Sequence, residues 1–260
     1  MRPVLTPGPV LFARYAYPPN ALGYCGPDDH GALFEAAASG RERALLRHLA
    51  AGFEGAWPYL ELIAAANGIA DPLERRVVEA YWIGNALSVR VPAAALIASL
   101  AQRFDRRAGS SFASIASSVL LGGIPQHSFH VFSVYPWLGM LRAGKSGTPL
   151  IVLDRCRIRW GVVEAVEADV AVVRSRVLTF AGSRLVLGNE VTERARYGLT
   201  GALFDAPLAP GEVVSLHWDW ICDRLDCAGV RALERSTRLN LRAVNALAAP
   251  GPAVVVDAGG

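Results

Sequence analysis

Apolar residues recur with a helical period along the first half of the chain. One stripe runs from Leu45 to Phe53, and three later prolines stand where a helix can begin. This pattern predicts about four helices within residues 32–104. Two further helices are predicted over 110–121, where a Gly-Gly pair follows, and over 125–135, where a proline follows.

After Pro149 the apolar period shifts toward two, as in strands with one buried face. Val-rich segments alternate with Gly, Asn, Asp or Pro breaks, which is typical of an antiparallel meander or a small barrel. The predicted strands are 151–166, 168–173, 176–180, 184–187, 190–197 and 212–220. An amphipathic helix is predicted from Leu225 to about Leu247, with Asp223 or Asp226 as its N-cap.

These patterns predict an α+β protein, in which an all-helical domain precedes a small antiparallel β-barrel and a C-terminal amphipathic helix. Residues 1–30 are rich in turn residues and are predicted to form an extended N-terminal arm. The helical domain covers 31–147, and the glycine-rich stretch 139–149 marks its boundary. The barrel and the last helix cover 148–248, and residues 249–260 are predicted to be a flexible tail.

The composition and charge of the chain argue against several classes of function. The chain has 260 residues and a net charge of +3, which is too slight and too scattered to indicate a nucleic-acid partner. No uninterrupted run of about 18 apolar residues predicts a membrane span. Prolines interrupt the place where a signal peptide would need an apolar run, so a cytoplasmic location is expected. The four cysteines are better suited to be ligands or nucleophiles than a disulfide framework.

A thiol and an imidazole stand in two segments about sixty residues apart. Cys156 lies in Asp-Arg-Cys-Arg-Ile-Arg-Trp-Gly at 154–161, and His217 ends Gly-Glu-Val-Val-Ser-Leu-His at 211–217. The pattern places them in the first and last predicted strands. A thiolate and an imidazole together suit a soft or borderline transition metal. We therefore expect Cys156 and His217 to be metal ligands, with Asp154 as an auxiliary residue.

Residues 152–248 resemble the HypC/HupF-type hydrogenase maturation chaperones. Cys156, Gly161 and Val163 keep the spacing between that family's cysteine and the Ile-Pro-Gly-x-Val motif that comes after it, and residues 211–217 match its closing Gly-Asp-Tyr-Val-Leu-Val-His strand. Leu225-Asp226 matches the Leu-Asp that precedes the family's final helix. The resemblance implies an OB-like β-barrel followed by a helix.

The same resemblance implies a function. In that family the cysteine and the histidine hold iron that carries cyanide and carbonyl ligands, on its way to the large-subunit precursor of nickel-iron hydrogenase. Cys156 and His217 would then be iron ligands in a metallochaperone that is not a classical enzyme, with other hydrogenase maturation proteins as partners. Zinc is the alternative metal. The motifs at 24–29 and 127–132 also resemble uncharacterised bacterial proteins encoded near nickel-iron hydrogenase genes.

Two features depart from the family, and the strand pattern adds a further difficulty. Cys156 is internal rather than N-terminal, and Trp160 replaces the proline of the motif. In a regular strand Cys156 and Trp160 share the face opposite Arg155 and Arg159. On this alternation the thiol does not point toward His217, so it can contact His217 only if Cys156 precedes the regular strand. The flanking arginines are expected to lower the pKa of the thiol.

A second candidate site lies in the helical half. His127 and His130 stand three residues apart on a predicted helix and can share a metal or an active site with Cys25 and His30. The alternative function is therefore a metal- or thiol-dependent enzyme whose site is formed by these residues. The apolar neighbours of both histidines equally fit buried core residues. The auxiliary residues of the candidate sites, besides Asp154, are Asp28, Asp29, Cys222 and Cys227.

Overall fold

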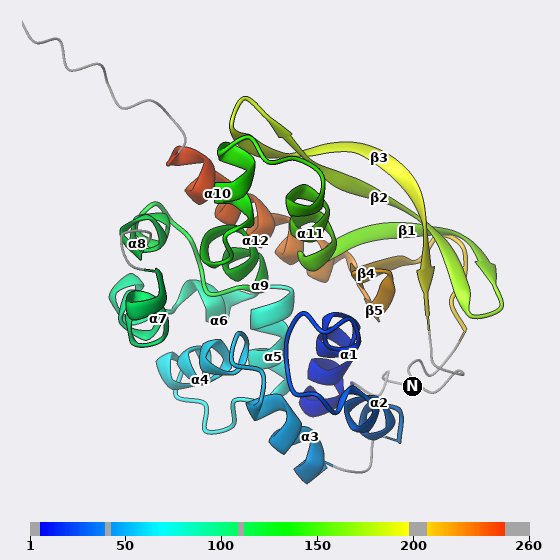
Figure 1. Cartoon of the computed structure of the whole chain (residues 1–260). Coiled ribbons are helices and arrows are strands. Elements are labelled where there is room, and N and C mark those ends of the chain that lie inside the picture. The colour runs from blue at the N-terminus through cyan, green and yellow to red at the C-terminus, as the bar shows by residue number, and fades with distance from the viewer. Residues whose placement is uncertain (1–5, 40–42, 109–111, 198–206, 248–260) are drawn as a thin grey trace, which may run out of the picture.

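The computed structural model describes residues 6–39, 43–108, 112–197 and 207–247. Helices and a five-stranded sheet combine in an α+β fold, in which the helices gather on one side and the sheet curves along the other (Figure 1). The predicted tail 249–260 lies outside the described residues. In the described part of the chain, no helix has the length and apolarity to cross a membrane.

The helices before the sheet agree with most of the predicted breaks. They are α1 (Gly8–Ala21), α2 (His30–Ser39), α3 (Arg43–Ala51), α4 (Trp57–Ala66), α5 (Arg75–Trp82), α6 (Ala86–Val89), α7 (Ala93–Ala108), α8 (Phe112–Leu120), α9 (His127–Phe129), the π-helical turn η2 (His130–Val134), α10 (Trp137–Arg142) and α11 (Thr148–Cys156). Predicted helix 110–121 is confirmed as α8. The segment 125–135 is helical as predicted, but it changes from α9 to the π-helical turn at His130.

The prediction that residues 1–30 are extended is wrong, because α1 occupies Gly8–Ala21. Its prolines are compatible with a helix for two reasons. One stands in the first turn, where a backbone N–H has no partner within the helix in any case. Pro18 and Pro19 lie in the last turns, where they remove only the final hydrogen bonds of the helix.

Five strands form the sheet: β1 (Arg159–Glu167), β2 (Val170–Ala181), β3 (Arg184–Arg196), β4 (Val213–His217) and β5 (Trp220–Arg224). Long strands β2 and β3 each join two of the predicted segments. The strands pair in the order β1-β2-β3-β5-β4, and β4 returns to β1, so the sheet closes on itself. The β3–β5 contact is a single parallel pair between Arg196 and Trp220, whereas the other pairings are antiparallel.

Cys156 does not lie in the first strand, which corrects the prediction for 151–166. Residues Thr148–Cys156 form α11, and β1 begins only at Arg159. The helix starts after Gly147 at φ 79° with a proline in its first turn, and its buried residues Pro149, Val152, Leu153 and Cys156 recur with a helical period. The thiol thus precedes the regular strand, as contact with His217 requires.

The predicted C-terminal helix is confirmed as α12 (Cys227–Ala246), with Asp226 as its N-cap. The Asp226 carboxylate accepts a hydrogen bond from Gly229 N at 2.7 Å. Packing also crosses the predicted domain boundary, since α1 contacts β4 and β5. Ile158, Cys222 and Leu233 belong to the same apolar core as the N-terminal helices. This packing brings residues from both halves of the sequence to one buried site.

Position 161 requires a glycine because β1 and β2 approach each other closely there. A Cβ atom there would lie 2.6 Å from Val173 Cγ1 and 2.7 Å from Arg174 O. We expect Gly161→Ala to lower the free energy of unfolding by about 1–3 kcal/mol, as overpacking does. Urea denaturation measures the change. The control is Gly139→Ala, a site in α10 where a Cβ meets nothing within 4 Å, and it is expected to be neutral or stabilising. An unchanged midpoint for Gly161→Ala would contradict the prediction.

Candidate metal centre

Three buried side chains converge where α9, α11 and β4 meet. His127 begins α9, Cys156 ends α11, and His217 ends β4. One ligand atom from each residue lies within 4.8 Å of the other two. Cys156 Sγ is 3.8 Å from His127 Nε2, and the rings of His127 and His217 are 5.0 Å apart. This group could hold a metal ion; we call it the His127–Cys156–His217 cluster.

His217 has one ring nitrogen fixed and the other free. Nδ1 lies 2.6 Å from the carbonyl oxygen of Tyr15, and because a carbonyl only accepts, Nδ1 carries the proton. The Tyr15 carbonyl is available because the residue four positions later is Pro19, which has no N–H to donate within α1. Nε2 of His217 therefore has a lone pair, and it is buried without a hydrogen-bond partner among the described residues. Ligating histidines commonly donate their other N–H to a carbonyl in this way.

His127 is held by a tyrosine on one side and by Cys156 on the other. Its Nε2–H donates to the backbone carbonyl of Cys156 at 2.9 Å, and Tyr81 OH donates to Nδ1 at 3.1 Å. Tyr81 OH also lies 3.5 Å from the carbonyl of Gly55. If the proton moves from Nε2 to Nδ1, Tyr81 can accept from Nδ1 and donate to Gly55. His127 Nε2 then has a lone pair that a metal can use once the Cys156 carbonyl, 2.9 Å away, turns aside.

Burial sets the protonation states of the cluster. It lowers the pKa of His127 to about 4, and together with repulsion from His127 it holds the pKa of His217 well below its usual range. Both imidazoles are neutral near pH 7, as metal ligands must be. Burial also raises the pKa of the Cys156 thiol, with a smaller contribution from Cys25. The expectation that arginines lower this pKa is wrong, because Arg155 and Arg157 are paired with Glu193 and Asp154.

Arg159 ties the backbone on both sides of the cluster. Its guanidinium donates to the carbonyls of Asp154 and Arg155 at 3.3 and 3.4 Å, just before Cys156, and to the carbonyl of Trp218 at 2.6 Å, just after His217. The side chain is 1% exposed and pairs with Glu193 at 2.9 Å. Arg159 therefore fixes the end of α11 against the end of β4.

An aromatic wall closes one side of the cluster. The Trp82 ring lies 4.7 Å from the ring of His127 and 5.7 Å from that of His217, and it stacks on Tyr15 at 5.4 Å. The indole Nε1–H of Trp82 is buried without a partner among the described residues. A buried donor of this kind costs free energy unless another group accepts from it.

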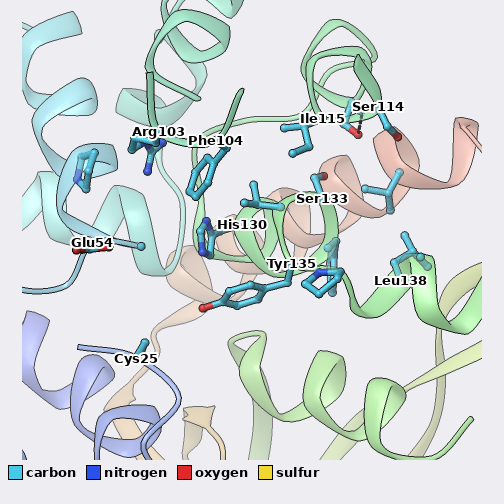
Figure 2. Close-up of a pocket in the computed structure, with 18 of the residues that line it drawn as sticks. Cys25, Glu54, Arg103, Phe104, Ser114, Ile115, His130, Ser133, Tyr135 and Leu138 are labelled. Carbon is cyan, nitrogen blue, oxygen red and sulfur yellow. Dashed lines mark hydrogen bonds between the residues drawn. The ribbon is translucent and has the colours of Figure 1, made fainter. Parts of the chain in front are cut away.

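The second candidate site does not form as predicted, because His127 belongs to the cluster. His130 instead lines a cleft of about 1380 Å³ together with Cys25 (Figure 2). Its Nδ1 is 3.2 Å from Tyr59 OH, and burial holds its pKa well below the usual range. His30 is exposed at the start of α2 and lies outside both sites. We name this pocket, lined by Cys25, Glu54, Arg103, Phe104, His130 and Tyr135 among others, the Arg103 cleft.

The predicted auxiliary residues have other roles or lie at the surface. Asp154 is buried and accepts hydrogen bonds from Arg157 and from Leu178 N at 2.8 Å, so it joins α11 to β2. Asp28 and Asp29 are exposed, and Asp29 accepts from Ala32 N at the start of α2. Cys222 is buried in β5, and Cys227 is exposed in the first turn of α12. Both are free thiols outside the cluster.

The pattern of the sequence missed several residues that build the centre. His127 was grouped with His130 because they are close in sequence, yet α9 gives way to the π-helical turn between them, at His130. Tyr15, Trp82 and Arg159 carry no local signal, since their roles depend on contacts with residues distant in the chain. The free carbonyl of Tyr15 is the exception: a proline four residues later in a helix marks it.

A family model matches residues 4–250 of the chain, and its description is "Family of unknown function (DUF6390)". No curated protein and no solved structure gives a significant match.

Proposed function

The chain belongs to this family of unknown function, DUF6390, and we propose that it binds one transition-metal ion through His127, Cys156 and His217. The observation that carries the proposal is the free, buried Nε2 of His217, whose ring is fixed by the Tyr15 carbonyl. A buried acceptor without a partner is costly, and a metal ion at the cluster would use its lone pair.

The spacing of the ligand atoms favours a small, four-coordinate ion. A tetrahedral centre with metal–sulfur and metal–nitrogen bonds of about 2.3 and 2.0 Å separates those two ligand atoms by about 3.5 Å. The 3.8 Å between Cys156 Sγ and His127 Nε2 is close to that value. Three protein ligands leave one position for an exogenous ligand, as in catalytic rather than structural zinc sites.

We further propose that the metal is iron carrying cyanide and carbonyl ligands, and that the protein is a cytoplasmic metallochaperone of nickel-iron hydrogenase maturation. The resemblance to HypC/HupF-type chaperones supports this proposal, and so does the order of the elements. A cysteine precedes β1, β4 ends in a histidine, the sheet closes on itself in the manner of an OB-like barrel, and α12 follows. Its partners would be other maturation proteins and the hydrogenase large-subunit precursor. Zinc is the alternative ion.

Infrared spectroscopy tests this identity of the metal. The protein is co-expressed anaerobically with hydrogenase maturation proteins and purified without oxygen. Cyanide and carbonyl stretching bands are expected on the wild-type protein and not on Cys156→Ala. Bound iron or zinc without these bands would support the proposed metal site but contradict the proposed role in hydrogenase maturation. Absence of any bound metal, measured by mass spectrometry, would contradict both proposals.

Metal binding at pH 7 is expected to release close to one proton per ion. The proton comes from the Cys156 thiol, whose raised pKa keeps it protonated, whereas the lowered pKa values of His127 and His217 leave no proton to displace. Calorimetric titration in buffers of different ionisation enthalpy counts the protons. Cys222→Ser, which alters another buried thiol, is the control and should release the same number. No proton release would show that the thiol is not a ligand.

A further inference from the structure

The Arg103 cleft is separate from the cluster and has its own unsatisfied polar groups. Figure 2 shows Arg103, Phe104 and His130 along one side of it, with Ser114 and Ile115 beyond them and Cys25 on the side opposite Arg103. His127, Cys156 and His217 do not line this cleft. Its volume of about 1380 Å³ exceeds what a small organic molecule needs.

Arg103 lines this cleft, and two nitrogens of its guanidinium are enclosed there. Its Nε donates to the carbonyl of Ser99 at 3.1 Å, whereas Nη1 and Nη2 have no hydrogen-bond partner within 3.5 Å among the described residues. The guanidinium also interacts with the Tyr59 hydroxyl, which partly offsets the rise that burial causes in the pKa of Tyr59. No ion pair of Arg103 occurs within the described part of the chain. The guanidinium lies 4.5 Å from the ring centre of Tyr59 and 4.9 Å from that of Phe104, so two aromatic rings fix its orientation.

We propose that the Arg103 cleft binds a small organic carboxylate, with the anion on Nη1 and Nη2 of Arg103 and an apolar body against the cleft walls. Two free N–H groups at one edge of a planar guanidinium match the two oxygens of a carboxylate. Phe104, Ile115, Phe132 and Leu138 provide apolar surface for the body of the ligand. This site goes beyond the proposed metal function and does not depend on it.

The charges around the cleft favour a monoanion over a phosphate. Arg142 also lines it, but its guanidinium is already used by the carbonyls of Val244 and Ser183 at 2.8 and 3.4 Å. His130 is neutral near pH 7, because burial lowers its pKa. Glu54 adds a negative charge to the lining. Lys145 also lines the cleft, but its side chain is exposed, so solvent screens its charge. The enclosed guanidinium of Arg103 therefore suits a single negative charge better than a phosphate dianion.

Benzoate is the probe, titrated into the full-length wild-type protein by calorimetry at pH 7. Arg103→Gln and Arg103→Lys are expected to weaken benzoate binding at least about tenfold, since lysine keeps the charge but loses the paired donors. Arg142→Gln should bind benzoate as the wild type does, because Nε and Nη2 of Arg142 already donate to backbone carbonyls. Intermolecular NOEs from the benzoate ring to Phe104 in the wild type provide evidence that does not depend on a variant folding.

Three outcomes would overturn the carboxylate site. The first is that the wild type does not bind benzoate. The second is equal affinity in wild type and Arg103→Gln. The third is displacement of benzoate by inorganic phosphate at a lower concentration than benzoate itself requires.

Discussion

Replacing Cys156 by serine is expected to lower the metal affinity of the protein at least about a hundredfold, because loss of a direct ligand costs more than the ten- to hundredfold typical of its supporting residues. Serine keeps nearly the same volume at the end of α11, but its hydroxyl is not a thiolate and does not ionise at neutral pH. The Cys156 side chain is 5% exposed, so solvent does not compensate for the missing ligand. Competition with a chromophoric chelator under anaerobic conditions measures the affinity.

Two matched controls separate the loss of a ligand from a general disturbance. Cys222→Ser alters another buried thiol, in β5, and should keep the wild-type affinity. His127→Gln should lose the metal, whereas His130→Gln should keep it, although both imidazoles are buried and both contact a tyrosine hydroxyl through Nδ1. Equal loss in a variant and its control would show that packing, not coordination, was changed. Wild-type metal affinity in Cys156→Ser would show that the Cys156 thiol is not a metal ligand.

The sequence did not predict that Cys156 and His217 lie close together; it predicted only what their contact would require. The sequence pattern placed the thiol in the first predicted strand and the histidine in the last, and contact between the two required Cys156 to precede the regular strand. It did not reveal how, because Ile151 and Val152 in a Val- and Leu-rich run suggested a strand. The helical period of Val152, Leu153 and Cys156 and the proline in the first turn were the competing signals, and they decide the local structure.

The rest of the cluster depends on tertiary contacts that no local period encodes. His127 lies 90 residues before His217 and joins it only because α1, α5 and the sheet share one core. Trp82 ends α5 and reaches both imidazoles by packing, not by spacing. Arg159 lies on the buried face of β1, although arginine usually marks the exposed face of a strand.

The inward direction of Arg159 is explained by a buried charge network at the junction of α11 and β1. Arg157 and Arg159 are each 1% exposed, Arg157 pairs with Asp154 at 2.9 Å, and Arg159 pairs with Glu193 at 2.9 Å. Arg155 also pairs with Glu193, and Ser175 donates a hydrogen bond to the same carboxylate. Removing one partner from such a network costs more than the pair contributes, because it leaves a buried charge without compensation.

Glu193→Gln is therefore expected to lower the free energy of unfolding by about 3 kcal/mol at pH 7. Burial alone raises the pKa of Glu193, but Arg159, Ser175 and Arg155 outweigh it, so the pKa lies below its usual value. A lowered pKa in the folded state means that the carboxylate stabilises the protein above the ordinary carboxyl pKa. That contribution is lost as the pH falls through the folded-state pKa, so the difference between Glu193→Gln and wild type should shrink in acid.

The exposed glutamate three residues earlier provides the matched control for urea denaturation at pH 7 and in acid. Glu190 is 52% exposed and pairs with Arg174, which is 42% exposed. Glu190→Gln should change the free energy of unfolding by less than about 1 kcal/mol, because solvent screens such a pair. Equal effects of the two substitutions would contradict a special role for the buried network. A large effect of Glu193→Gln, accompanied by weaker metal binding, would place Arg159 and its carboxylate among the residues that hold Cys156 against His217.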